Sequence, residues 1–165
     1  MKKISFLGLS IILLINFSAC TGYKPIFSSS NLLFEIADYS LSGEKKLANK
    51  IYSRLNNLSN SNKNNPEAES VSVFIEISKD KVATVKNSKG KIIEYKINLN
   101  SNIIVKNYLT NDKILDKNFT SSLSYKVQDQ YSETVKIENT TTDNLINKIY
   151  QDLLIQLSEK MLAEW

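Results

Sequence analysis

Cys20 is the residue whose chemistry is easiest to assign, because it is the only cysteine of the 165 residues and directly follows an apolar segment. Lys2 and Lys3 precede that segment, which ends at Phe17. About 14 apolar residues are too few to cross a bilayer of about 30 Å, so the pattern predicts an export signal over residues 1–19. A lone thiol has no intramolecular disulfide partner, and we expect it to be lipidated, as in bacterial lipoproteins. An ordinary cleaved signal that leaves an incidental thiol is the alternative.

The residue types that most often carry out catalysis are poorly represented. The sequence has no histidine, which removes the commonest general base and a common metal ligand. Carboxylates and lysines are scattered without catalytic spacing, so we expect no enzyme, no metal and no cofactor. The formal charge is only +4, part of it from the signal segment, and this is too weak to indicate a nucleic-acid partner.

The remaining sequence divides into a tether and one domain. Residues 20–31 hold Gly22, Pro25 and a short serine run, and this composition predicts an irregular tether that leads away from the lipidated cysteine. Residues 32–165 then form a single domain that is long enough to bury a core. Thr21 is not the aspartate that favours inner-membrane retention, so we expect an outer-membrane protein anchored by lipid and facing the periplasm.

The domain begins with a strand and a helix. Apolar and polar residues alternate over 32–39, which predicts a half-buried strand. Over 44–60 the apolar spacing changes to three and four, which predicts an amphipathic helix with Ser42 as its N-cap. The apolar stripe of that helix consists of Leu47, Ile51, Leu55 and Leu58.

An antiparallel meander follows. Apolar and polar residues alternate with a period of two in three segments, at 71–85, 93–105 and 119–127. Turn residues at 87–90 and 110–112 join these segments, so we expect three antiparallel strands with one buried face. The middle strand is expected to contain a bulge near Asn100–Asn102. Tyr95 and Tyr125 share the predicted core face.

A last helix completes the predicted fold. Residues 128–141 are polar, and the spacing beyond them predicts a helix from Thr142 or Asp143 to Leu162. The element order is then β-α-β-β-β-α. We expect an α+β two-layer sandwich with a four-stranded, mostly antiparallel (mixed) sheet and both helices on one face.

The start of the mature chain resembles a known family. Residues 20–27 read C-T-G-Y-K-P-I-F, which is similar to the start of the LPS-assembly lipoprotein family, LptE. Thr21 is an extra residue against the usual Cys-Gly pair, whereas the element order and the mature length agree with the family. The resemblance implies a protein that plugs the lumen of the LPS-translocation β-barrel, LptD, assists its assembly and binds LPS for delivery to the cell surface. Under this interpretation Tyr23, Pro25 and Phe27 dock on the barrel or on the domain, or lie at the membrane interface.

The resemblance also implies that basic side chains at one end of the sheet contact the anionic ligand. In the predicted meander, Lys86, Lys89 and Lys91 lie around one hairpin, and Lys126 ends the next strand at the same end. Ammonium groups gathered at one tip suit the phosphates of a glycolipid. The alternative is that a lysine-rich protein carries lysines in every turn. Lysines also gather at the opposite end of the sheet, so charge alone does not rank the two ends as ligand sites. These lysines are Lys106, Lys113 and Lys117.

Two other functions remain open. A lipoprotein that assists another envelope machine, such as outer-membrane protein insertion or lipid transport, would have the same anchor and a similar small α/β domain. An envelope hydrolase would need a nucleophile and a base that the sequence does not offer. The identity of the partner distinguishes the first two functions.

Replacing Cys20 by alanine tests the anchor. We expect Cys20→Ala to release the protein from the membrane fraction, because the lipid chains have no other attachment point. The measurement is the distribution of the protein between membrane and supernatant after cell fractionation. A variant that stays in the membrane would show that something other than the Cys20 thiol holds the chain there.

Overall fold

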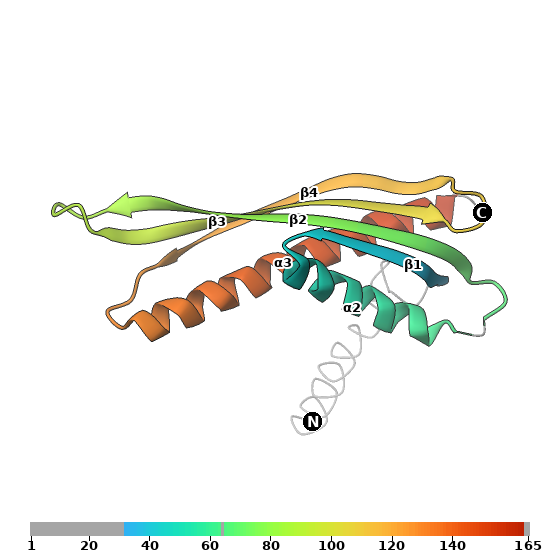
Figure 1. Ribbon diagram of the computed structural model, residues 1–165, viewed down its shortest axis with the longest axis horizontal. Helices are drawn as coiled ribbons and strands as arrows, with labels where there is room; N and C mark the ends of the chain where they lie inside the picture. Colours follow the sequence, from blue (N-terminus) through green and yellow to red (C-terminus); the bar gives the residue numbers. More distant parts are fainter. Residues whose placement is uncertain (1–31, 64, 164–165) are drawn as a thin grey trace, which may run out of the picture.

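The computed structural model describes residues 32–63 and 65–163. The expected signal peptide, Cys20 and the tether residues Tyr23, Pro25 and Phe27 lie outside the described residues. Six elements follow one another along the described chain (Figure 1). They are β1 (Phe34–Gly43), α2 (Lys45–Ser61), β2 (Glu69–Lys86), β3 (Ile92–Asn107), β4 (Lys113–Lys126) and α3 (Tyr131–Ala163). The predicted order β-α-β-β-β-α is confirmed.

The four strands form one mixed sheet in the order β1-β2-β3-β4. β1 pairs with β2 in parallel through the α2 crossover, whereas β2, β3 and β4 form an antiparallel meander. The other side of β4 has no neighbouring strand within the described chain. From Asn118 to Tyr125 this edge strand carries no charged residue and no proline.

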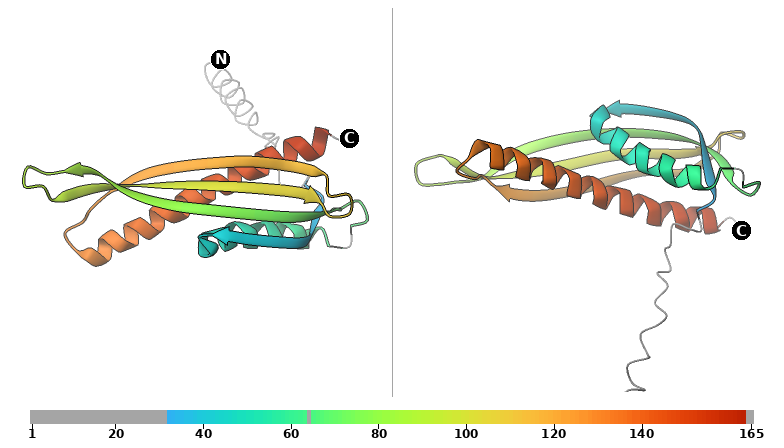
Figure 2. Two further views of the ribbon diagram at one scale, coloured as in Figure 1. Left: turned by 45° about the horizontal axis from the view of Figure 1, so that its top comes forward. Right: turned by 90° about the horizontal axis from the view of Figure 1, so that it is seen from below.

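Both helices cover the same face of the sheet and lie side by side (Figure 2). The alternating apolar residues of β2 and β3 point to this face and are fully buried, with Ile77, Ile97 and Ile103 at 0% exposure. Each helix buries one apolar stripe against them, as its spacing of three and four requires. An ion pair between Lys50 and Asp143 joins the two helices across their exposed sides. The predicted α+β layer arrangement is therefore confirmed.

The start of α3 differs from the prediction, because the helix begins at Tyr131 and includes most of the stretch expected to be a polar loop. Threonines with low helix propensity occupy 140–142, and the first turns carry few apolar residues to form a stripe. In these turns Ile137 packs against the core, Glu138 bonds to Tyr125 of β4, and Thr134 bonds to Gln128 in the loop after β4. A search for apolar spacing therefore places the start of the helix about three turns too late.

Ser42 is not the N-cap of α2. It belongs to β1 and pairs with Glu76 of β2, and α2 begins after Glu44, whose side chain makes no capping hydrogen bond. The chain turns at Gly43, which has a positive φ of 68°, and the N–H of Glu44 donates to the carbonyl of Ile77 at 2.8 Å. The backbone of β2 therefore takes the place of the expected side-chain cap.

The bulge expected near Asn100–Asn102 is also absent, since the pairing of β3 with both neighbours is regular there. Ser101 occupies the core-facing position and is 2% exposed, so the alternation continues in phase with a small polar residue in place of an apolar one. In β2 and β3 the irregularities lie nearer the strand ends, after Ala83 and Val105.

Gly43 offers a test of the β1–α2 turn. A Cβ atom at this position would lie 2.1 Å from the carbonyl oxygen of Ile77, in addition to the cost of a positive φ. We expect Gly43→Ala to lower the free energy of unfolding by about 2–5 kcal/mol, measured by urea denaturation. Gly90→Ala is the matched control: Gly90 also has a positive φ, but nothing lies within 4 Å of its added Cβ, so its loss should stay near about 1–2 kcal/mol. Equal losses for the two variants would contradict the close approach at Gly43.

Candidate functional site

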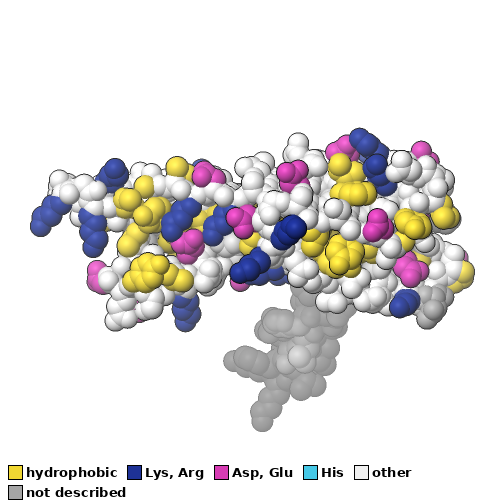
Figure 3. Space-filling view, viewed as in Figure 1, with side chains coloured by type: hydrophobic (Ala, Val, Ile, Leu, Met, Phe, Trp, Pro, Cys, Tyr) yellow, Lys and Arg dark blue, Asp and Glu magenta, His cyan; other side chains and the backbone are white. Residues whose placement is uncertain are grey.

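The tip of the β2–β3 hairpin carries three of the four lysines selected from the sequence. Lys86, Lys89 and Lys91 are exposed there, and the lysines at this end are visible in Figure 3. Asn87 holds the turn: its side-chain oxygen accepts the N–H groups of Lys89 and Lys91 at 3.0 and 2.9 Å. Gly90 supplies the positive φ of 78° that closes the turn. The spacing of the lysines is thus set by an ordered turn.

The fourth lysine lies close behind the tip. Lys126 is exposed near the end of β4 and pairs with Glu94 of β3 in the sheet register. The carboxylate of Glu94 accepts a hydrogen bond from the hydroxyl of Thr84 at 2.8 Å. Within residues 32–63 and 65–163, none of the four lysines forms a salt bridge. We call Lys86, Lys89, Lys91 and Lys126 the lysine tip.

The lysines at the opposite end of the sheet are engaged with polar partners. Lys113 forms a salt bridge with Asp116 at 2.6 Å, and this contact lowers the pKa of the Asp116 carboxyl. Lys106 donates to the side-chain oxygen of Asn111 at 3.3 Å, and Lys117 donates to Gln156. The two ends carry similar numbers of lysines, but only the lysine tip keeps its charges free of such partners.

Apolar side chains accompany the lysine tip. Val82, Val85 and Ile93 lie on the same hairpin and remain 44%, 41% and 40% exposed. Lysine ammonium groups next to exposed aliphatic side chains form a surface that is both cationic and apolar. Such a surface suits an amphiphilic anion better than a purely ionic one.

A polar and aromatic cluster supports the hairpin where it extends beyond the aliphatic core. We call Lys79, Lys81, Tyr95, Tyr125 and Glu138 the Glu138 cluster. The Glu138 carboxylate accepts hydrogen bonds from Lys79 at 3.1 Å, from Lys81 at 2.6 Å and from the Tyr125 hydroxyl at 2.8 Å. The two tyrosine rings stack with centroids 5.9 Å apart, and the Lys81 ammonium lies 4.4 Å from the Tyr95 centroid. The contacts join β2, β3 and β4 to the first turns of α3.

The electrostatics of this cluster follow from its burial and its donors. Burial alone would raise the pKa of Glu138, but hydrogen bonds from Lys81, Tyr125 and Lys79 outweigh that effect and lower the pKa to about 2. The hydrogen bond to Glu138 raises the pKa of Lys81. Burial raises the pKa of Tyr125, so its hydroxyl stays protonated and can donate. The cluster is therefore a fixed set of charges at neutral pH.

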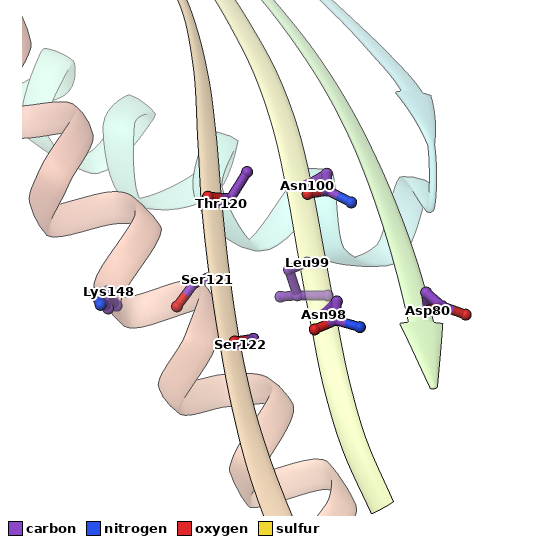
Figure 4. Close-up of a pocket in the computed structure, with 8 residues that line it drawn as sticks. All are labelled: Asp80, Asn98, Leu99, Asn100, Thr120, Ser121, Ser122 and Lys148. Carbon is purple, nitrogen blue, oxygen red and sulfur yellow. The ribbon is translucent and has the colours of Figure 1, made fainter. Parts of the chain in front are cut away.

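The face of the sheet opposite the helices is rich in amide and hydroxyl groups. Asn98, Asn100 and Asn102 of β3 pair in register with Ser122, Thr120 and Asn118 of β4. A shallow depression of about 520 Å³ is lined by residues of the three antiparallel strands and α3, so it extends from this face past β4 to the side covered by the helices (Figure 4). Its lining consists of Asp80, Asn98, Leu99, Asn100, Thr120, Ser121, Ser122 and Lys148. This face can form hydrogen bonds with another polar surface.

The arrangement provides binding surfaces. Among the described residues no three carboxylate or cysteine side chains lie close enough to hold a metal ion. None of the described helices is both long and apolar enough to cross a membrane. The Glu138 cluster was missed from the sequence, although two patterns indicate it. Lys79 and Lys81 continue the period-two spacing of Ile75 and Ile77, and Glu138 lies four residues before Thr142 on the same helical face.

The fold is shared with solved structures of bacterial lipoproteins. Rare lipoprotein B from Shewanella oneidensis is similar with a TM-score of 0.54 and 15% identity, over 78% of this chain and 99% of that chain. A minor lipoprotein from Acinetobacter baumannii gives 0.51 and 14%, over 79% and 95%. Uncharacterized lipoprotein B from Nitrosomonas europaea gives 0.52 and 14%, over 81% and 88%. At these identities the likeness concerns the fold alone.

Sequence comparison adds no relative: no family model matches the chain, and no curated protein matches it. The fold thus places the chain among proteins with the α+β architecture of small bacterial lipoproteins.

The Glu138 cluster makes a prediction about acid stability. The pKa of Glu138 is about 2 in the folded protein and 4.5 in its ordinary state, so its contribution is complete above about pH 5 and is lost as the pH falls towards 2. We expect the wild type to lose about 3 kcal/mol more than Glu138→Gln over this range. Urea denaturation at a series of pH values measures the difference. Glu133→Gln, which removes an exposed carboxylate from the same helix, should keep the wild-type slope, and parallel curves for wild type and Glu138→Gln would refute the assignment.

Proposed function

We propose that this protein is an outer-membrane lipoprotein that binds lipopolysaccharide at its lysine tip and plugs the β-barrel that carries lipopolysaccharide to the cell surface. The observation that carries the proposal is the lysine tip: four lysines without carboxylate partners next to exposed aliphatic side chains. Lipopolysaccharide combines phosphate groups with acyl chains, so its chemistry complements both parts of this surface. The N-terminal motif at residues 20–27 and the lipoprotein fold point in the same direction.

Binding needs no covalent step. The lysines act as flexible point charges for phosphate oxygens, and Val82, Val85 and Ile93 offer apolar contact beside them. The Glu138 cluster holds the hairpin against α3, so the lysines are presented by a supported element. This support reduces the conformational entropy that the hairpin would lose on binding.

The open sheet face supports the plug part of the proposal. Barrel interiors in the outer membrane are polar, and a plug needs hydrogen-bonding groups on the surface that meets them. The asparagine, serine and threonine side chains of β3 and β4 supply such groups along these two strands. A plug of this kind contributes complementary polar surface and assists the barrel to assemble around it.

The partner is identified by a pull-down. We expect the tagged, lipidated protein, purified from its native membrane in mild detergent, to bring down a large outer-membrane β-barrel of the lipopolysaccharide-translocation type in stoichiometric amount. A different envelope complex would reject the plug and favour the accessory function in another envelope machine. Recovery of the protein without any barrel would also reject the plug.

Charge reversal tests the ligand site. We expect Lys89→Glu combined with Lys91→Glu to weaken lipopolysaccharide binding at least about tenfold, because two charge-assisted contacts are replaced by repulsion. The measurement is binding of labelled lipopolysaccharide to the purified protein at low and high salt, with circular dichroism to confirm folding. Lys45→Glu combined with Lys46→Glu, an equal charge change at exposed positions of α2, is the matched control and should bind normally. A folded tip variant that binds like the wild type would reject the lysine tip as the site.

A further inference from the structure

The loop between β3 and β4 presents two large apolar side chains to the solvent. Tyr108 is 52% exposed and Leu109 is 82% exposed, the highest exposure of any aliphatic side chain described. We call residues 108–112 the Leu109 loop. Single exposed leucines are common on protein surfaces, so the question is whether the structure holds this one in place for a reason.

The loop is an ordered turn. The side-chain oxygen of Asn107 accepts the N–H groups of Leu109 and Thr110 at 2.9 and 3.0 Å. The N–H of Asn107 donates to the carbonyl of Asp112 at 2.9 Å, and the carbonyl of Asn107 accepts the N–H of Asn111 at 3.0 Å. Asn111 adopts a positive φ of 62°, an uncommon conformation for a residue other than glycine. The exposed position of Leu109 is therefore fixed by the hydrogen bonds of an ordered turn.

The Leu109 loop lies at the end of the sheet where the described chain begins. The N–H of Tyr108 donates to the carbonyl of Ser70 at 2.8 Å, and the N–H of Glu69 donates to the carbonyl of Leu33 at 3.0 Å. The start of β1, the start of β2 and the loop are thus neighbours (Figure 1). Since strands lie about 4.8 Å apart, the loop is about 10 Å from the start of β1.

The length of chain before Leu32 limits how far this end can be from the lipid. Fully extended, the residues between Cys20 and Leu32 span at most about 40 Å. The 18 residues of β2 extend over about 60 Å towards the lysine tip. An anchor on Cys20 therefore keeps the Leu109 loop within reach of the bilayer, and the lysine tip is the most distant part of the sheet.

A bilayer suits the loop better than a protein partner does. Two side chains fall far short of the roughly 1,200 Å² that a stable protein interface buries. For a protein that is already anchored, however, a small second contact with the same membrane is enough, because the anchor makes the second contact intramolecular. Tyrosine is favoured at the headgroup level and leucine in the hydrocarbon below it.

We propose that the Leu109 loop inserts Tyr108 and Leu109 into the leaflet that holds the Cys20 lipid, so that the domain stands with its lysine tip away from the bilayer. The proposal concerns the lipoprotein before it meets its barrel, and it rests on the lipid anchor of the proposed function. It does not depend on lipopolysaccharide binding.

Tryptophan quenching tests the orientation. The mature, lipidated chain carrying Trp165→Phe receives either Leu109→Trp or, as a control at the other end, Ser88→Trp, and is placed in phosphatidylcholine vesicles with or without a brominated phosphatidylcholine. We expect the Leu109→Trp protein to lose most of its fluorescence to the brominated lipid and the Ser88→Trp protein to lose almost none. Circular dichroism checks that both variants are folded.

The other outcomes overturn the proposal in distinguishable ways. Proteins that float with the vesicles but show equal quenching, or none, would retain the anchor and disprove the orientation. Proteins that fail to float would reject the lipid anchor itself, and with it the inference. A Leu109→Trp signal that is insensitive to brominated lipid but shifts to shorter wavelength on addition of the purified barrel would assign the loop to a protein contact instead.

Discussion

The carboxylate of Glu138 accepts hydrogen bonds from two lysines of β2 and a tyrosine of β4, and the outer part of the molecule depends on this group. The aliphatic core ends before the hairpin does, so the long strands β2 and β3 would extend without cover. The first turns of α3 supply that cover through a charged and aromatic contact. Burying a carboxylate is costly, and here three donors offset the cost. The hairpin that carries the lysine tip is held by this contact rather than by hydrophobic burial.

The lysines at the two ends of the sheet differ in whether they have polar partners, so the two ends differ in how readily they can bind an anion. At the β3–β4 end, Lys106, Lys113 and Lys117 are engaged by asparagine, aspartate and glutamine side chains. At the hairpin end the carboxylate of Glu94 accepts a hydrogen bond from Thr84 and forms no salt bridge with the lysines within the described residues. A charge count treats the two ends as equal, whereas the pairing makes one of them available to an anion. Together with the ordered Asn87 turn, this difference supports a binding surface at the hairpin.

Most of the fold follows from the sequence because its strands and helices obey simple periods. The β1–α2 unit, the meander and the aliphatic part of α3 all show apolar residues at the spacing that their burial requires. The failures occur where polar groups do the packing. Ser101 keeps its place in the core without an apolar side chain, and the carbonyl of Ile77 takes the role expected of Ser42. The contact of Glu138 joins segments 57 and 59 residues apart, so the local patterns at Lys79, Lys81 and Glu138 indicate which faces these residues lie on but not that they meet. The lysine tip was found because turn residues and strand spacing fix which lysines share an end.

The uncharged outer edge of β4 bears on the concentration at which the chain begins to aggregate. Strand edges without charge, proline or a bulge act as templates for other strands, and natural proteins usually protect them. Between Asn118 and Tyr125 this edge carries neither a charge nor a proline, α3 packs against β4 there, and every copy of the chain presents the same sequence to its neighbours. Pairing of two copies along this edge would need two molecules to meet, so we expect it to become more frequent as the concentration of the chain rises. Whatever covers the edge of β4 would therefore also protect the chain from aggregation.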